Sequence, residues 1–143
     1  MIIGNGVDII DNKRIEKSLK IKGFKKRLFT LNEIKQSKKY RNKTNYFAKR
    51  FAAKEAFVKS IGTGFRDNIN FNDIEIYNNK KGNPKIKISQ KIKDILKKKF
   101  KLKNCDIHLS LSDEKNHSIA FVILNRKKSV SYTHLRAHET INH

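Results

Sequence analysis

Three side chains in this sequence have the types and spacing needed for phosphoryl chemistry: Asp8, Glu55 and Lys59. Glu55 and Lys59 are four residues apart, so a helix would carry them on one side, one turn from each other. Mg²⁺ prefers carboxylate, water and phosphate oxygens as ligands, and a nearby lysine offsets phosphate charge. The set predicts metal-assisted transfer of a phosphoryl-type group. The alternative is a simple Glu55–Lys59 ion pair, worth only about 0.3–0.5 kcal/mol on a helix surface.

Glycines adjoin these residues at two places. Strand periodicity puts Gly4 and Gly6 on the same face as Asp8, where we expect them to leave room around its carboxylate. The segment Gly62-Thr63-Gly64 follows Lys59 and is predicted to end a helix. Such a turn lets backbone N–H groups approach a phosphate without a Cβ in the way. Both sets of glycines favour a site for a metal or an anion.

Two further cations, Arg50 and Lys54, lie close to Glu55 on the same predicted helix. When residues are placed about 100° apart around a helix axis, both fall within or at the margin of its apolar arc. Charges in such a position are costly unless they are paired or meet a ligand. We therefore expect both side chains to neutralise phosphates.

Helices and strands are predicted in an irregular order, which indicates a mixed α+β domain rather than a doubly wound sheet. Thr30 and Glu33 have the spacing of a capping box, so Glu33 is interpreted as a helix cap rather than a catalyst. The sequence predicts strands over 2–10, 74–77, 85–88, 106–111 and 118–124, and helices over 11–23, 45–61 and starting at 30 and 89.

The chain has 143 residues, the size of a single compact domain. Residues 129–143 resemble the translation of a sequencing-library adapter, so we assign the domain to residues 1–128 and interpret the rest as a non-native tail. The alternative is a genuine tail, in which His134 and His138 would form a pair able to bind metal.

The net charge of +21 predicts an anionic partner without saying which class it belongs to. A single cysteine excludes a disulfide framework within the chain and fits a reducing compartment. No signal peptide or membrane-spanning segment is recognisable, so we expect a cytoplasmic protein with no membrane partner.

Several motifs occur in the order typical of one known family. They are Gly6-x-Asp8, Phe29-Thr30-x-x-Glu33, FAKRFAAKEAFVKSIGTG from Phe47 to Gly64, Gly82-x-Pro84, and HLSLSD from His108 to Asp113. Together they resemble holo-acyl-carrier-protein synthases, which are small 4'-phosphopantetheinyl transferases, over residues 1–125. The resemblance implies an antiparallel sheet packed with helices and a homotrimer with sites at subunit interfaces.

The resemblance implies Mg-dependent transfer of the phosphopantetheine arm of coenzyme A (CoA) to a serine of apo acyl carrier protein. Adenosine 3',5'-bisphosphate would be released, and the reaction would serve fatty acid biosynthesis. By the family's motif, Asp8 and Glu55 would hold Mg²⁺, for which Mn²⁺ is expected to substitute. Lys59 would stabilise charge on the phosphate, while the general base is left open among Lys59, Glu55 and a metal-bound water.

The same resemblance implies which residues hold CoA. Asp113 stands where some family members have histidine, and an aspartate cannot pair with the 3'-phosphate. The turn reads Gly-Asn-Pro instead of the commoner Gly-Lys-Pro. The CoA-binding residues implied are Arg50, Lys54, Gly62, Thr63, Gly64, Pro84, Ser112 and Asp113.

Acyl carrier proteins are acidic, so the resemblance gives the surplus positive charge a use in steering such a partner. The alternative is a solvated basic face in a lysine-rich proteome. The residues implied in carrier docking belong to the first predicted helix and the segment after it; they are Arg14, Lys17, Lys20, Lys25 and Arg27.

A competing interpretation is a basic RNA-binding or ribosome-associated module, supported by the net charge and the lysine-rich run from Lys91 to Lys103. That run has apolar residues at core-like spacing, and no aromatic and glycine-rich RNA-binding strand occurs. The carboxylates of Asp8 and Glu55 would also repel phosphate without a metal. We therefore expect no nucleic-acid partner.

Overall fold

The chain is described by a computed structural model that covers residues 1–66 and 68–127. The predicted non-native tail, with His134 and His138, lies outside these residues. The elements, in chain order, are β1 (Ile2–Asp11), α1 (Asn12–Leu19), α2 (Phe24–Leu28), α3 (Leu31–Ser37), α4 (Lys43–Ile61), a short 3-10 helix η1 (Phe71–Asp73), β2 (Ile74–Asn78), β3 (Pro84–Ile88), α5 (Gln90–Phe100), β4 (Cys105–Asp113) and β5 (His117–Arg126). They form a single α+β domain, as predicted.

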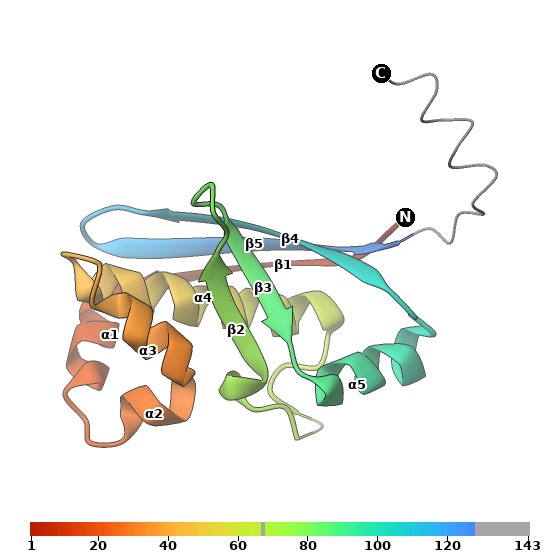
Figure 1. The fold of residues 1–143 in the computed structure, drawn as a ribbon, viewed down its shortest axis with the longest axis horizontal. Coiled ribbons are helices and arrows are strands. Elements are labelled where there is room, and N and C mark those ends of the chain that lie inside the picture. Colours follow the sequence, from red (N-terminus) through yellow and green to blue (C-terminus); the bar gives the residue numbers. More distant parts are fainter. Residues whose placement is uncertain (67, 128–143) are drawn as a thin grey trace.

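Two antiparallel sheets organise these elements. One has three strands in the order β1-β5-β4, and the other is the β2–β3 hairpin. Helix α4 runs along one face of the larger sheet, the hairpin crosses beside it, and α1 to α3 lie at the opposite end of the molecule from α5 (Figure 1). None of the helices in the described part of the chain is long and apolar enough to span a membrane.

Glycines in β1 let the backbone of α4 approach the strand very closely. A Cβ at Gly4 would clash with the carbonyl oxygen of Ser60, and one at Gly6 would clash with that of Ala56. The alternation predicted for β1 is confirmed, because Gly6 and Ile10 are buried under α4 while Asp8 lies between them. The glycines therefore leave room for the helix rather than for a ligand around Asp8, which corrects the prediction from sequence.

The capping box predicted at the start of α3 is present, and its glutamate, Glu33, also contacts residues outside this helix. Thr30 accepts a hydrogen bond from the N–H of Glu33, and Glu33 Oε1 accepts one from the N–H of Thr30 at 2.8 Å. Glu33 is fully buried, and its Oε2 accepts a hydrogen bond from the N–H of Ile76 in β2 at 2.7 Å.

The predicted helix over 11–23 is shorter than expected, because α1 ends at Leu19 and α2 begins at Phe24.

The face of the larger sheet that points away from α4 is apolar and exposed. Val7 pairs across the strands with Phe121, and Ile9 pairs with Ile119. Their exposed fractions are 50% and 42% for the first pair and 63% and 37% for the second. All the helices labelled in Figure 1 lie on the other side of this sheet. A monomer therefore leaves a contiguous apolar strip in contact with water.

Candidate active site

Asp8, Glu55 and Lys59, far apart in the sequence, come together where β1 crosses α4. Lys59 Nζ lies 3.1 Å from Asp8 Oδ1 and also donates a hydrogen bond to the carbonyl oxygen of Val7 at 3.0 Å. The close approach permitted by Gly6 places the strand carboxylate within reach of the helix side chain. In the described part of the chain Lys59 is paired with Asp8, and no Glu55–Lys59 ion pair forms.

The two carboxylates of this cluster interact unfavourably with each other. Burial raises the pKa of Glu55, the negative charge of Asp8 raises it further, and Lys59 and Arg14 act in the opposite direction. The net effect on the pKa of Glu55 is upward, with burial as its largest cause and Asp8 as the largest contribution from a charge. An added cation at this place would relieve that repulsion.

The donor set fits Mg²⁺. The described residues contain no group of three or more His, Cys, Asp and Glu side chains suited to a metal, so they do not form an all-protein cage. Mg²⁺ rarely needs one, because it keeps water and binds through one or two carboxylates together with substrate phosphates. Asp8, with 16% of its side chain exposed, and the half-buried Glu55 supply such a pair.

The turn after α4 depends on its glycines for a conformational reason. Gly62 has φ 75° and ends the helix by donating its N–H to the carbonyl oxygen of Lys59 at 3.1 Å, while Gly64 has φ 60°. An added Cβ at either glycine would meet no atom within 4 Å. Thr63 is buried and its hydroxyl donates to the carbonyl oxygen of Gly64 at 2.8 Å. The left-handed backbone, rather than close packing, explains both glycines.

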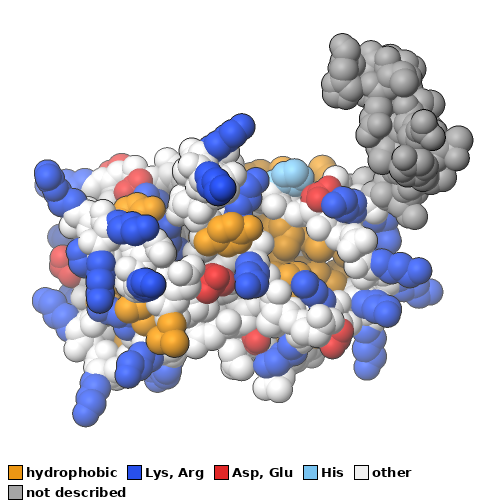
Figure 2. Space-filling model, viewed as in Figure 1, with side chains coloured by type: hydrophobic (Ala, Val, Ile, Leu, Met, Phe, Trp, Pro, Cys, Tyr) orange, Lys and Arg blue, Asp and Glu red, His pale blue; other side chains and the backbone are white. Residues whose placement is uncertain are grey.

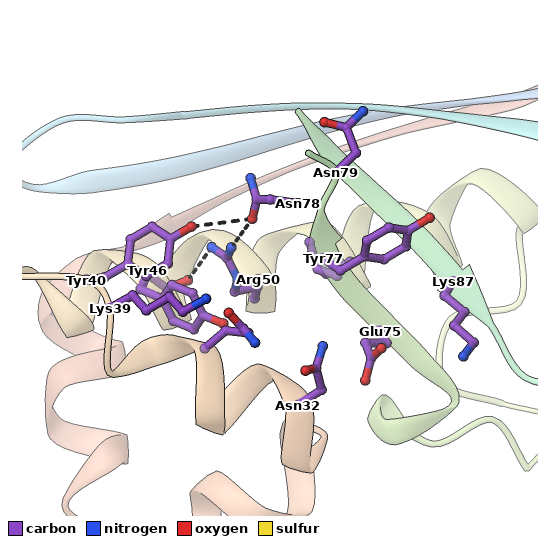
Figure 3. Close-up of a pocket in the computed structure, with 12 residues that line it drawn as sticks. Asn32, Lys39, Tyr40, Tyr46, Arg50, Glu75, Tyr77, Asn78, Asn79 and Lys87 are labelled. Carbon is purple, nitrogen blue, oxygen red and sulfur yellow. Dashed lines mark hydrogen bonds between the residues drawn. The ribbon is translucent and has the colours of Figure 1, made fainter. Parts of the chain in front are cut away.

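Arg50 lies at the wall of a cavity of about 680 Å³ between α3, α4 and the β2–β3 hairpin (Figure 3). The residue is 3% exposed, and its guanidinium sits 3.6 Å from the centre of the Tyr46 ring. It donates to Asn78 Oδ1 at 2.8 Å and to the carbonyl oxygen of Tyr46 at 3.3 Å, while its Nε is buried without a partner. Lys39, Lys87 and the carboxylate Glu75 also line the cavity, so cations outnumber anions at its wall.

The ring of Tyr46 packs against the guanidinium of Arg50. Burial is the main cause that raises the pKa of Tyr46 to about 12, and the hydroxyl donates to the carbonyl oxygen of Glu33 at 2.6 Å. The ring thus stays neutral at physiological pH and provides a fixed aromatic face for the guanidinium.

The expectation that Lys54 binds CoA is wrong. Its side chain is fully buried and donates to Glu33 Oε1 and to the carbonyl oxygen of Leu28, both at 2.7 Å. Burial lowers the pKa of Lys54, and the Glu33 carboxylate opposes that shift. The ammonium of Lys54 is therefore neutralised by Glu33 inside the core and not by a ligand.

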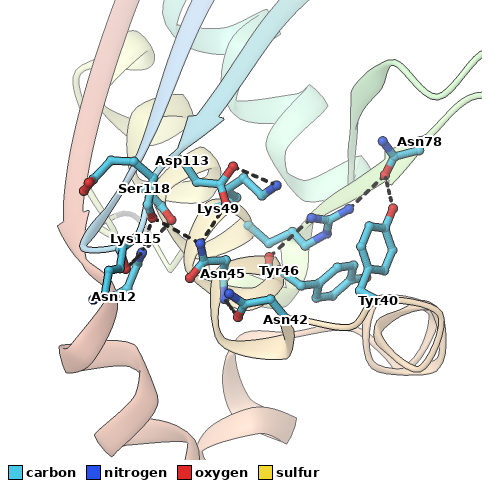
Figure 4. Close-up of polar contacts among 12 residues, drawn as sticks. Asn12, Tyr40, Asn42, Asn45, Tyr46, Lys49, Asn78, Asp113, Lys115 and Ser118 are labelled. Carbon is cyan, nitrogen blue, oxygen red and sulfur yellow. Dashed lines mark hydrogen bonds and ion pairs between the residues drawn. The ribbon is translucent and has the colours of Figure 1, made fainter.

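Ser112 and Asp113 point to opposite faces of β4, as consecutive strand residues must. Ser112 pairs across the strands with Ile119 on the exposed apolar face, whereas Asp113 pairs with Ser118 on the α4 side. Asp113 accepts a hydrogen bond from Asn45 Nδ2 at 2.7 Å and lies 3.4 Å from Lys49 Nζ (Figure 4). The two residues therefore cannot contact one ligand from within a single chain.

Lys49 and Asn45 were missed as partners of Asp113, although their i, i+4 spacing on α4 was visible in the sequence.

Pro84 begins β3 and lines a separate cavity of about 530 Å³ together with His108 and Phe121. Its lining includes Ser110 from the exposed apolar face and Leu109 from the α4 side, so the cavity lies along the outer edge of β4.

The residues expected to dock a carrier protein are all exposed, and they occupy α1, α2 and the segment between them. Arg14 is close enough to Glu55 to counteract the upward shift of that carboxyl's pKa. Lys and Arg side chains are nevertheless spread over the whole visible face in Figure 2, so this surface is not the only basic one. The members of the set are Arg14, Lys17, Lys20, Lys25 and Arg27.

Comparison with known proteins places this geometry in a family. Residues 4–122 match the model of the 4'-phosphopantetheinyl transferase superfamily. The holo-[acyl-carrier-protein] synthase of Pelagibacter ubique (strain HTCC1062) is 54% identical over 126 residues, which cover 88% of this chain and 98% of that protein. The synthase of Wolbachia pipientis (strain wPip) is 46% identical over 129 residues, covering 87% and 98%.

Solved structures agree with the sequence relatives. A holo-(acyl-carrier-protein) synthase from Bacillus anthracis in complex with CoA (3',5'-ADP) is 36% identical, with a TM-score of 0.74, covering 89% of this chain and 99% of that one. The Helicobacter pylori synthase in complex with coenzyme A is 30% identical, with a TM-score of 0.72, covering 85% and 99%. The chain therefore belongs to the holo-acyl-carrier-protein synthases of the 4'-phosphopantetheinyl transferase superfamily.

Proposed function

We propose that the chain transfers the 4'-phosphopantetheine arm of CoA to a serine hydroxyl of apo acyl carrier protein at the cluster of Asp8, Glu55 and Lys59. The observation that carries this assignment is the convergence of two carboxylates and a lysine from β1 and α4, with Lys59 Nζ 3.1 Å from Asp8 Oδ1. As a holo-acyl-carrier-protein synthase, the chain is a transferase that serves fatty acid biosynthesis.

Asp8 and Glu55 are proposed to hold Mg²⁺ or Mn²⁺. When bound by these carboxylates, the metal would supply positive charge that stabilises the negative charge developing on the leaving phosphate. The raised pKa of Glu55 supports this role, because its main charge-related cause is Asp8, whose negative charge a cation would offset. Fixing the pyrophosphate against two rigid elements orients its phosphorus for attack by the serine hydroxyl.

Lys59 is proposed to stabilise the phosphate rather than to accept a proton. Its ammonium donates to two oxygens, those of Asp8 and Val7, and half of its side chain is exposed. A charged donor beside the carboxylates can turn toward an incoming phosphate oxygen. Glu55 is then the remaining candidate base among these side chains, and it can accept the serine proton directly or through water.

The nucleotide end of CoA is proposed to occupy the cavity beside Arg50. Two features support this: the cavity has cations at its wall, and the Nε of Arg50 is buried without a partner. CoA and 3',5'-ADP are bound in the relatives from B. anthracis and H. pylori. The pyrophosphate is proposed to lie along the turn at Gly62, Thr63 and Gly64, because the two glycines carry no Cβ that would shield their backbone N–H groups.

Pro84 and Ser112 are proposed to complete the site across a subunit interface. Ser112 and Pro84 lie on or beside the exposed apolar face, away from the Asp8 side of the sheet. A homotrimer built on that face would bury the apolar strip and bring these residues next to a neighbouring subunit. Asp113 is neutralised by Lys49 and would hold backbone geometry instead of the 3'-phosphate.

The acidic carrier protein is proposed to dock on α1 and α2. The position of Arg14 supports this surface, since it lies close to Glu55 and would bring the serine of the carrier to the metal. Arg14→Glu is expected to slow loading strongly at low salt and progressively less at high salt, because screening weakens attraction between exposed charges. Lys98→Glu, an exposed lysine of α5, is the matched control. Equal salt profiles for the two variants would contradict docking at α1.

A loading assay tests the assignment. The full chain, apo acyl carrier protein and CoA are incubated with Mg²⁺, and the mass of the carrier is followed. The expected result is a shift by one phosphopantetheine that disappears with EDTA and returns with Mg²⁺ or Mn²⁺. A mass shift that persists in EDTA would contradict a role for the metal, and the absence of a mass shift with any carrier would refute the function. The reaction is proposed to take place in the cytoplasm, and the free Cys105 fits reducing conditions there.

A further inference from the structure

A second cavity lies between the β2–β3 hairpin, the helix α5 and the start of β4. Its volume is about 340 Å³. Tyr77 and Lys87 also line the cavity beside Arg50, and no other lining residue is assigned to the metal, to CoA or to carrier docking. Figure 2 shows hydrophobic side chains gathered on this face with Lys and Arg side chains around them.

The floor and walls of this cavity are apolar. Leu96 of α5 and Leu102 after it are buried at 2% and 3% exposure, and they form the base. Ile86 of β3 and Ile107 of β4 are half-buried at the sides, and Tyr77 of β2 is more exposed. A volume near the lower end of the range for ligand pockets would admit a single alkyl chain rather than a bulky ring system.

The rim of the cavity is positively charged. The exposed lysines Lys87, Lys93 and Lys103 come from β3, α5 and the segment before β4. No acidic residue lines the cavity; Asp106, which follows Cys105 in β4, is not among its lining residues. Lysine stems can cover apolar surface while the ammonium groups stay in water, where they would meet an anionic head. This arrangement complements an amphipathic anion.

We propose that this cavity binds the anion of a medium-chain fatty acid, with its alkyl chain against Leu96 and Leu102 and its carboxylate at the lysine rim. A small inorganic anion would leave the apolar walls exposed to water, and a neutral lipid would leave the rim without a partner. Tyr77 and Lys87 line both this cavity and the one beside Arg50. The ligand would therefore touch the hairpin that also borders the nucleotide cavity, which goes beyond the proposed transfer reaction.

The single cysteine of the chain provides a direct readout that does not depend on enzymatic activity. Cys105 lines the cavity and is half-buried, and the whole sequence contains no other cysteine. The full chain is treated with N-ethylmaleimide, and the rate of labelling is measured by intact mass with dodecanoate, acetate or dodecyltrimethylammonium present below micelle concentrations. Far-UV circular dichroism checks that the fold persists.

Dodecanoate is expected to slow labelling in a saturable way, by about tenfold at a concentration ten times its Kd. Acetate, which lacks the chain, and dodecyltrimethylammonium, which has the opposite charge, are expected to leave the rate unchanged. Equal protection by the cationic surfactant would show a merely apolar surface and overturn the proposal. The proposal would also be overturned if dodecanoate gave no protection of Cys105, or if protection depended on the protein concentration and not on dodecanoate.

Variants separate the rim from the floor. Lys93→Glu and Lys103→Glu are each expected to weaken dodecanoate binding about three- to tenfold. Lys98→Glu, on the same helix as Lys93 but outside the cavity, is not expected to weaken it. Ile86→Trp should fill the cavity and abolish protection. All of these residues lie outside the catalytic machinery, so carrier loading tests the transferase separately. Equal Kd values for Lys93→Glu, Lys103→Glu and Lys98→Glu would refute the role of the rim.

Discussion

Gly6→Ala is predicted to damage both stability and activity, because the Cβ would fall on the backbone of α4. The added atom would clash with the carbonyl oxygen of Ala56 and lie 2.9 Å from the nitrogen of Ser60. Both neighbours are backbone atoms, so no side chain can rotate to make room. Overpacking of this kind costs about 1–3 kcal/mol, against a gain of about 0.4–1 kcal/mol from a stiffer unfolded chain.

With the clash at the upper end of that range, we expect a net loss of about 2 kcal/mol, which lowers Tm by about 6–12 °C for a domain of this size. The strand and helix must also separate, which moves Asp8 away from Glu55 and Lys59. A displacement of about 1 Å in a catalytic group can cost about 100-fold in rate. Loading should therefore fall by more than the loss of folded protein explains.

Thermal unfolding followed by circular dichroism measures the first effect, and carrier loading at a temperature where both proteins are folded measures the second. Gly82→Ala is the control, because Gly82 has φ 87° in the hairpin turn and an added Cβ there would meet no atom within 4 Å. That variant should lose about 1–2 kcal/mol through backbone conformation alone and keep its loading rate. A Gly6→Ala protein with wild-type Tm and wild-type loading would refute the close approach of β1 and α4.

Three further predictions concern the core, the carboxylates and the apolar face. Lys54→Met should destabilise the fold by about 3–5 kcal/mol in urea titrations, since it leaves the buried Glu33 carboxylate unpaired, and Lys54→Met combined with Glu33→Gln should recover part of the loss. The pKa of Glu55 is raised in the folded state, so its ionised form costs stability at neutral pH and that cost disappears once the pH falls below the unfolded pKa. Glu55→Gln should accordingly raise Tm at about pH 7 but not below about pH 4, and a rise of equal size at both would contradict the assignment. Phe121→Glu should convert a trimer seen by light scattering into monomers with an intact fold, and a wild-type chain that is already monomeric would refute the proposed interface.

Local signals in the sequence were enough to predict most of the elements. The capping box at Thr30 and Glu33, the glycine end of α4 and the alternation in β1 all depend on neighbours within a few residues, and the structure confirms them. The approach of Asp8 to the helix carboxylate was predicted from residue chemistry and from the family resemblance together. The partner of Lys59 was uncertain, because Asp8 is distant in sequence and Glu55 is close.

Long-range contacts explain what the sequence could not predict. Lys54 looked free for a ligand because its partner, Glu33, lies in another helix and had already been explained as a cap. Gly4 and Gly6 suggested space for a ligand, whereas the space is filled by a helix that joins the strand only in the fold. Ser112 and Asp113 are adjacent in sequence, yet the pleat of β4 sends them to opposite faces.

The dependence of carrier loading on Glu55 and Mg²⁺ tests the central claim most directly. Initial rates are measured across a Mg²⁺ titration for the wild-type chain, for Glu55→Gln and for Lys98→Glu as a surface control. If Glu55 and Asp8 hold the metal, the Glu55→Gln protein should fold normally, require far more Mg²⁺ and load the carrier at least about 100-fold more slowly at any concentration. A folded Glu55→Gln protein with the wild-type rate and Mg²⁺ dependence would show that this carboxylate is structural and would contradict the account.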